Sequence, residues 1–424
     1  MHRLRELHTR FEHSIPYAEH GSIRNVLEAY GESRTMLGMC ARAVERTLLP
    51  GVARGTICIV AFGSVGRLDG VLQVSDYDTM FIYPGGKDQD TVDSLRETIT
   101  SLVTTNSAMP FDHREEIEAR RFAFDDSPAY PVISQNELLS AIQPPRTLQT
   151  LTEARVIAGW DAVDSMSKQL LAERYGFAND RHSIDLRLLR DDLARLRTAY
   201  CSEVCGRLTE RPRSLGNRKI LKLFALREFH YLATLFALAE LAMIVQARAN
   251  EQVVGLALTL LSSPSFLKVA SFADPTGTLN RMLLSSTSLM AECSASLARH
   301  AGRPTGSGIE SPSAGPLHSQ SVLSLIMDVL RPYDHLLEMV HDPAFLAEIG
   351  RFEPDVTTWM AHPVFRRILQ YRGRLISASS KLAEALLDVL GVLEQDVGCQ
   401  AIDEAKITLD LIRTYELQMG PPAA

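Results

Sequence analysis

A glycine-rich segment followed by two closely spaced aspartates is the part of the chain best suited to chemistry. The segment reads Gly63-Ser-Val-Gly66-Arg67, and the aspartates are Asp76 and Asp78. Glycine allows unusual backbone conformations and close approach to a ligand, and the free N–H groups of such a turn form an anion-binding concavity. Two carboxylates two residues apart on an extended chain point to the same side and suit Mg²⁺, which prefers oxygen ligands. The pattern therefore predicts a site for a nucleoside triphosphate and its metal ions.

Strands on either side must hold these residues in place. Residues 56–62 are nearly all apolar and rich in β-branched side chains, which predicts a buried strand. Residues 79–83 form a second apolar run, and Pro-Gly-Gly at 84–86 closes it with a turn signal. We therefore expect strands at 56–62 and 78–83, a helix near 89–104 and a third strand at 115–124.

The Gly-Ser turn followed by Asp-x-Asp resembles the DNA polymerase β-like nucleotidyltransferase superfamily. Residues 63–69 and 75–78 are most similar to the branch that holds the bacterial adenylyltransferase of glutamine synthetase, the uridylyltransferase of the nitrogen-regulatory protein and related nucleotidyltransferases. Asp69 stands where that branch usually has Glu. The resemblance implies that Asp76 and Asp78 are catalytic metal ligands. It implies nucleotide binding by the turn, that is by Gly63, Ser64, Gly66 and Arg67.

Arg67 has two possible roles in this scheme. It could counter phosphate charge, or it could brace the turn by pairing with Asp69, and bracing is favoured because the acidic residue lies two positions away.

The resemblance also implies a third carboxylate on a later strand. Residues 117–120 read Ile-Glu-Ala-Arg and resemble the Val-Asp-Leu-Arg strand of the adenylyltransferases, which makes Glu118 the preferred catalytic and metal-binding residue. Residues 151–160 resemble a Leu-x-x-Ala-Arg-x-x-Ala-Gly-Asp segment that follows the catalytic domain in these enzymes, and this second match supports that register. Asp112 is the alternative third carboxylate.

A basic stretch lies further along the chain, at residues 207–227. Within it, Lys219 and Arg227 match a Lys and an Arg of the family, which implies a contact with the nucleotide or with an acidic acceptor. The alternative is that these side chains form the solvated face of a helix whose other face is apolar.

The function implied by the resemblance is transfer of AMP or UMP from ATP or UTP to a hydroxyl of a protein acceptor that docks on the helical region. Two Mg²⁺ ions are the expected cofactors, with Mn²⁺ as an alternative. Two other interpretations stay open. One is transfer to a small molecule or to an RNA end, and the other is a catalytically silent regulator that binds nucleotide.

Composition excludes some classes of protein. The net charge of −7 and the pI near 6.0 argue against a general nucleic-acid surface, so DNA is not an expected partner. The six cysteines lack a C-x-x-C pairing, which favours reduced thiols in a cytoplasmic protein. Residues 231–245 are the most apolar segment, but they are too few to span a bilayer and contain Glu240, so we expect a buried helix and no membrane association.

The expected fold is α+β: a small mixed-sheet nucleotidyltransferase domain with N-terminal helices, followed by a large all-α region. No convincing strand is expected after residue 147, and helical spacing covers residues 147–175. A segment dense in Pro, Gly and Ser predicts a linker. The expected divisions are an N-terminal helical segment at 1–52, the catalytic domain at 53–146, a helical docking domain at 147–302, the linker at 303–318 and a C-terminal helical block at 319–424.

Overall fold

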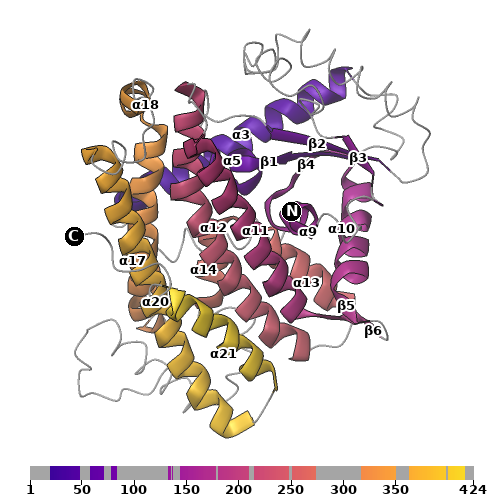
Figure 1. The fold of residues 1–424 in the computed structure, drawn as a ribbon. Coiled ribbons are helices and arrows are strands. Elements are labelled where there is room, and N and C mark those ends of the chain that lie inside the picture. Colours follow the sequence, from indigo (N-terminus) through magenta and orange to yellow (C-terminus); the bar gives the residue numbers. More distant parts are fainter. Residues whose placement is uncertain are drawn as a thin grey trace. The chain divides into compact units, whose positions relative to one another are not determined.

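The computed structural model is mostly helical and contains a small four-stranded sheet and a two-stranded one, so its class is α+β (Figure 1). The structure describes residues 20–47, 58–70, 78–83, 132–134, 136, 144–177, 180–209, 214–247, 251–273, 317–349, 362–397 and 400–415. The expected helix at 89–104, the third strand at 115–124 and residues 303–316 of the expected linker lie outside these residues. Residues 317 and 318, the last two of that linker, belong to helix α17 (Leu317–His341). The chain divides into two compact units, and the division falls inside helix α3, after Val26.

The first unit, residues 27–184, contains a four-stranded sheet in the order β3-β2-β1-β4. Its strands are β1 (Cys58–Phe62), β2 (Asp78–Tyr83), β3 (Val132–Ser134) and β4 (Arg155–Ala158). β1 is antiparallel to both β2 and β4, whereas β3 is parallel to β2. A separate two-stranded pairing joins β5 (Gly176–Phe177) to β6 (Asp180–Ile184). The expected strands at 56–62 and 78–83 are thus confirmed over the described residues.

The described helices of this unit are α3 (Arg24–Thr47, from residue 27 onward), α5 (Gly63–Arg67), α9 (Pro144–Glu153) and α10 (Trp160–Tyr175). In α3, Ala29, Tyr30, Met36 and Cys40 recur at helical spacing and are buried. α9 begins with two prolines, which fit a helix start because their missing N–H groups need no partner there. α10 packs against β1, β4 and β6.

β4, β5 and β6 correct the expectation that no strand follows residue 147. Residues 147–175 were expected to form helix without a strand, but the structure places β4 between α9 and α10. Gly159, with φ 78°, separates β4 from α10 in a conformation that favours glycine. The sheet therefore includes a strand from beyond residue 146, and β4 is the edge strand next to β1.

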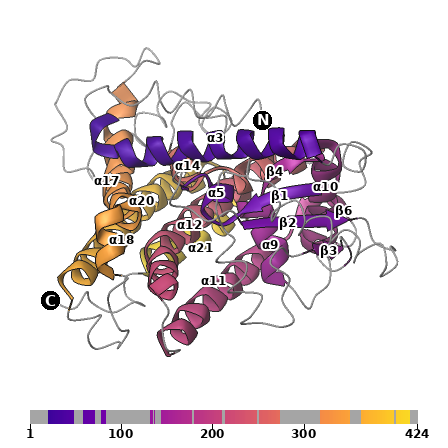
Figure 2. The same cartoon turned by 90° about the horizontal axis from the view of Figure 1, so that it is seen from above.

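The second unit comprises residues 1–26 and 185–424 and is entirely helical in its described part. It contains η1 (Gly21–Ile23), the first turn of α3, α11 (Leu186–Thr209), α12 (Ser214–Ala247), α13 (Glu251–Leu261), α14 (Ser265–Ala273), α17 (Leu317–His341), α18 (Pro343–Ile349), α20 (Pro363–Val397) and α21 (Gln400–Arg413). Figure 2 shows these long helices from above.

α12 forms the centre of the helical unit. It packs against α11, α14, α17 and α21, and its side chains are buried without a break from Leu232 to Ala242. This confirms the buried helix expected within residues 231–245. None of the helices in the described part of the chain has the length and hydropathy needed to cross a bilayer.

Asp334 of α17 fixes the beginning of α3 within the helical unit. One carboxylate oxygen accepts the backbone N–H of Val26 at 2.9 Å, and the other accepts the side-chain amide of Asn25 at 2.7 Å. A carboxylate at a helix start satisfies amides that lack partners within the helix and interacts favourably with the helix dipole. Burial nevertheless raises the pKa of Asp334, although these hydrogen bonds and the nearby His335 oppose the shift.

Candidate functional site

The glycine-rich segment lies directly after β1 and forms the short helix α5. Gly63 has φ 63°, in the left-handed region where side chains are strained, so the sequence needs glycine there. α5 ends at Leu68, which is also left-handed with φ 63°. The Leu68 N–H donates to the Val65 carbonyl at 3.1 Å, and the Asp69 N–H donates to the Ser64 carbonyl at 2.9 Å. We call residues 63–70 the 63–70 turn. All of its residues are buried.

Gly66 is required by close packing of the main chain. A Cβ at this position would lie 2.3 Å from the Glu153 carbonyl oxygen and 2.6 Å from the Ala61 carbonyl oxygen. Both distances are far below van der Waals contact, and both neighbours are backbone atoms that cannot rotate away. The glycine therefore lets α5 sit against the end of β1 and the end of α9.

The sheet register brings Asp78 next to the 63–70 turn. In the antiparallel pair of β1 and β2, Asp78 lies opposite Phe62, the residue immediately before Gly63. Opposed Cα atoms in such a pair are about 5 Å apart. The first residue of β2 and the first residue of the turn are thus close together in the fold, although fifteen residues separate Phe62 from Asp78 in the sequence.

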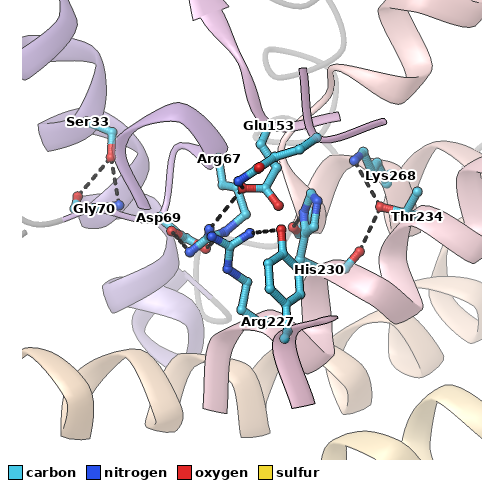
Figure 3. A network of polar contacts seen from close by, with 12 residues as sticks. Ser33, Arg67, Asp69, Gly70, Glu153, Arg227, His230, Thr234 and Lys268 are labelled. Atoms are coloured by element: carbon cyan, nitrogen blue, oxygen red, sulfur yellow. Dashed lines mark hydrogen bonds and ion pairs between the residues drawn. The ribbon is translucent and has the colours of Figure 1, made fainter. Parts of the chain in front are cut away.

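Buried ionic contacts brace the turn from within (Figure 3). The Arg67 guanidinium donates from Nε and Nη2 to the two carboxylate oxygens of Asp69, at 3.0 and 3.1 Å. Its Nη1 lies 3.4 Å from Oε2 of Glu153. Arg67 and Asp69 are each 4% exposed and Glu153 is fully buried. The bracing role favoured from the sequence is therefore the one the structure displays, and a contact of Arg67 with phosphate stays a prediction.

A second arginine lies beside this ionic group. Arg155 begins β4 and lies opposite Ala61 in the sheet register. Burial lowers the pKa of its guanidinium to about 10, while Tyr30 and Glu153 act in the opposite direction. Nη1 donates to the Ala154 carbonyl at 2.9 Å. Glu153 thus interacts electrostatically with arginines from two different elements.

Ser33 of α3 holds the other end of the turn. Its hydroxyl donates to the Gly70 carbonyl at 2.9 Å and accepts the Gly70 N–H at 2.8 Å, and the side chain is fully buried (Figure 3). Both backbone groups of Gly70 are therefore satisfied by one side chain. Sequence reasoning missed Ser33 and Glu153, because a single serine in a helix and a glutamate at a helix end carry no local signal for contacts this distant in sequence.

The structure accounts for only part of the predicted metal site. Asp78 begins β2, but nothing is described of its side chain, and Asp76, Asp112 and Glu118 lie outside the described residues. Within the described residues no group of three or more His, Cys, Asp or Glu side chains could hold a metal ion. The convergence of three carboxylates therefore stays a prediction, as does the choice between Glu118 and Asp112.

The two predicted basic residues belong to the helical unit, on α12. Lys219 lies on α12, but its side chain is not among those that the structure describes. Arg227 donates from Nη1 to the Tyr200 hydroxyl at 2.6 Å, and its guanidinium lies 4.2 Å from the centre of the Tyr200 ring. These contacts hold Arg227 against α11, and its proposed contact with nucleotide is untested.

A buried ion cluster lies on the same helix. Glu228 accepts Nη2 of Arg372 at 2.5 Å, and Nε of Arg197 lies 3.6 Å from its other oxygen. Aromatic rings cover the two arginines: Arg197 lies 4.5 Å from the centre of the Tyr415 ring, and Arg372 lies 4.2 Å from that of Phe224. This cluster joins α11, α12 and α20 to Tyr415, which lies just after the end of α21.

A second buried polar group lies where α12 packs against α14. Nδ1 of His230 is 3.0 Å from the Ser265 hydroxyl, and Nζ of Lys268 is 3.2 Å from the Thr234 hydroxyl (Figure 3). The Thr234 hydroxyl also donates to the His230 carbonyl at 2.7 Å. These contacts tie the two helices together inside the apolar core.

Comparison of the chain with models of known protein families, with curated proteins and with solved structures found no match. The chemistry must therefore be derived from the site itself. The 63–70 turn offers main-chain amides and a serine next to the first residue of β2, and the sequence supplies a second aspartate two residues before it.

Proposed function

We propose that this chain is a Mg²⁺-dependent nucleotidyltransferase that transfers a nucleoside monophosphate, AMP or UMP, from its triphosphate to a hydroxyl of a protein. The observation that carries the proposal is the register of β1 and β2, which sets Asp78 opposite the residue before Gly63. It supports a site in which a turn rich in main-chain amides and a pair of carboxylates serve one ligand. A triphosphate with its metal ions needs both kinds of group.

The donor set fits magnesium, because Asp76, Asp78 and a third carboxylate offer only hard oxygen ligands. In the proposal the third ligand is Glu118, with Asp112 as the alternative. Two bound Mg²⁺ ions would neutralise phosphate charge and lower the barrier for attack by the acceptor hydroxyl.

The chain's own residues would orient the substrate. Ser64 and the backbone amides of residues 63–66, at the beginning of α5, would hold the phosphates through hydrogen bonds. The acceptor oxygen attacks the α-phosphorus, the bond from that phosphorus to the bridging oxygen breaks, pyrophosphate leaves with the bond's electron pair, and the hydroxyl proton passes to a carboxylate or to water. The ion pairs of Arg67 keep the turn in shape, and preorganised donors contribute most when they need not rearrange during the reaction.

The proposal further includes docking of the acceptor on the helical unit and a cytoplasmic location. The size of that unit and the length of its helices support docking, since they provide a large surface beyond what a small catalytic sheet needs.

The proposal is tested by incubating the purified chain and Mg²⁺ with α-phosphate-labelled ATP or UTP and a fractionated lysate. We expect labelled protein and released pyrophosphate with the wild type, and loss of at least about 10²-fold in rate with Asp78→Asn. Label found only in a small molecule or an RNA would move the activity to another acceptor. Triphosphate binding with no pyrophosphate release from either protein would instead make the chain a nucleotide-binding regulator.

A further inference from the structure

Glu153, the last residue of α9, meets the 63–70 turn at two separate points. Its side chain lies 3.4 Å from Nη1 of Arg67, and its carbonyl oxygen occupies the space that a Cβ on Gly66 would need. The two contacts use different parts of one residue and fall on consecutive residues of α5. Glu153 therefore fixes both the position of the short helix and the direction of its arginine.

The surroundings of Glu153 hold its carboxylate in a single orientation. Nε2 of Gln149, one helical turn earlier, lies 3.4 Å from the same oxygen that faces Arg67. Arg155 interacts favourably with Glu153 from the other side of the α9–β4 junction. The side chain is fully buried, so water does not screen these interactions.

Charge balance gives Glu153 a role that Asp69 cannot fill alone. The buried group contains two guanidiniums, of Arg67 and Arg155, and two carboxylates, of Asp69 and Glu153. Among these four described side chains, neutralising Glu153 would leave two guanidiniums beside one carboxylate in a buried setting, where removal of one partner is strongly unfavourable. Relief would come from movement of Arg67, which is part of the turn itself.

We propose that Glu153 is a positioning residue of the nucleotide site: acting through Arg67 and Gly66, it keeps the 63–70 turn in the form that receives the triphosphate, and it touches no ligand. The part of this inference that concerns the ligand rests on the proposed function. The part that concerns the order of the turn does not, because it can be measured in the protein alone.

The test compares Glu153→Gln with Glu173→Gln. Glu173 on α10 accepts the amide of Gln169 at 2.6 Å, so it repeats the Gln149–Glu153 spacing, but on an exposed surface. Hydrogen exchange reports on the backbone amides of Leu68 and Asp69, whose hydrogen bonds close the turn. Calorimetry with inorganic tripolyphosphate and Mg²⁺ reports on phosphate binding without a base or an acceptor.

In Glu153→Gln we expect exchange of the Leu68 and Asp69 amides to quicken by about tenfold or more, since a hydrogen bond to a charged group is lost. Exchange in α12 should not change. Tripolyphosphate binding should weaken by a similar factor, and KM for the nucleotide should rise more than kcat falls. Glu173→Gln should match the wild type in every measurement.

Unchanged exchange at Leu68 and Asp69 in a folded Glu153→Gln would overturn the inference. If that variant does not fold, Gln149→Ala is measured instead, because it removes only the amide that orients Glu153. We then expect a smaller increase in the exchange rate of the Leu68 and Asp69 amides. An unchanged exchange rate in Gln149→Ala would count against the inference. Quicker exchange in a protein whose wild type binds neither tripolyphosphate nor nucleotide would leave the positioning role intact and refute the proposed function.

Discussion

Buried arginine–carboxylate contacts occur in both units, but in one unit they stabilise a turn and in the other they join helices. In the sheet unit, Arg67 pairs with Asp69 two residues away and with Glu153 at the end of α9, and the result is a fixed turn. In the helical unit, Glu228 pairs with Arg197 and Arg372 from two other helices. The first group shapes a short length of backbone, whereas the second joins long helices.

The neighbours of the arginines also differ between the two units: they are aromatic rings in the helical unit and main-chain groups in the sheet unit. Arg197 and Arg372 lie over aromatic rings, so cation–π contacts add to the ion pairs and fill the space between helices. Around the 63–70 turn the neighbours are main-chain groups, including the Ala61 and Glu153 carbonyls that approach Gly66. We infer that the cluster of the helical unit serves stability, whereas the group in the sheet unit serves the geometry of a site.

The largest expected effect comes from breaking the cluster of the helical unit. Glu228→Ala removes the carboxylate and leaves Arg197 and Arg372 without it in a mostly buried setting, which should cost about 3–5 kcal/mol in unfolding free energy. Urea unfolding followed by circular dichroism measures this loss. Tripolyphosphate binding by the folded fraction should stay unchanged, and a specific loss of binding at full stability would break the distinction between the two groups.

The next effect comes from filling the space at Gly66. Gly66→Ala places a methyl group against two backbone carbonyls, and the strain should cost about 1–3 kcal/mol in unfolding free energy or more. Phosphate binding should fall with it, because α5 must shift. Thermal unfolding and calorimetry measure the two changes.

Gly31→Ala is the matched control in the same unit. Gly31 lies inside α3 and a Cβ there meets nothing within 4 Å, so the variant should be unchanged or more stable by about 0.5–1 kcal/mol. Equal loss of stability in the two variants would show that the packing at Gly66 is not special.

A smaller effect is expected from the carboxylate that caps α3. Burial raises the pKa of Asp334 above its ordinary value near 3.8, so the folded state binds the proton more tightly than the unfolded state does. The stability that Asp334 contributes, relative to Asp334→Asn, should therefore fall as the pH rises from that ordinary value through the raised one, and then level off.

This prediction is checked by urea unfolding of both proteins over a series of pH values. His335 acts on the pKa of Asp334, but its side chain is about half exposed, so solvent screens this interaction. A difference that grows as the pH rises would contradict the expected sign.

Local patterns in the sequence predicted the parts of the site that are close together in the chain. The apolar runs around residues 58–62 and 78–83 form strands, with residues 58–62, Met80 and Ile82 buried. Gly63 is needed because its φ is positive. The pairing of Arg67 with Asp69 could also be expected, since only two residues separate them.

Contacts between distant residues could not be predicted in this way. Residues 155–158 were expected to be helical because helical spacing surrounds them. They form a strand because they pair with β1, which lies almost a hundred residues earlier in the sequence. Ser33 and Glu153 likewise reach the turn only because the fold brings α3 and α9 to it. The sequence suggested that Gly66 faces phosphate. The structure shows that Gly66 faces two protein carbonyls, and its contact with phosphate stays a prediction.

The central claim is that the 63–70 turn and the Asp76–Asp78 pair form one magnesium–triphosphate site. Calorimetric titration of the wild type and of Asp78→Asn with a non-hydrolysable ATP or UTP analogue, with and without Mg²⁺, tests it most directly. The claim predicts binding by the wild type that requires Mg²⁺ and is weakened by at least about tenfold in Asp78→Asn, since a charged ligand to the metal is lost. Equal binding by the two proteins, or binding that ignores Mg²⁺, would contradict it.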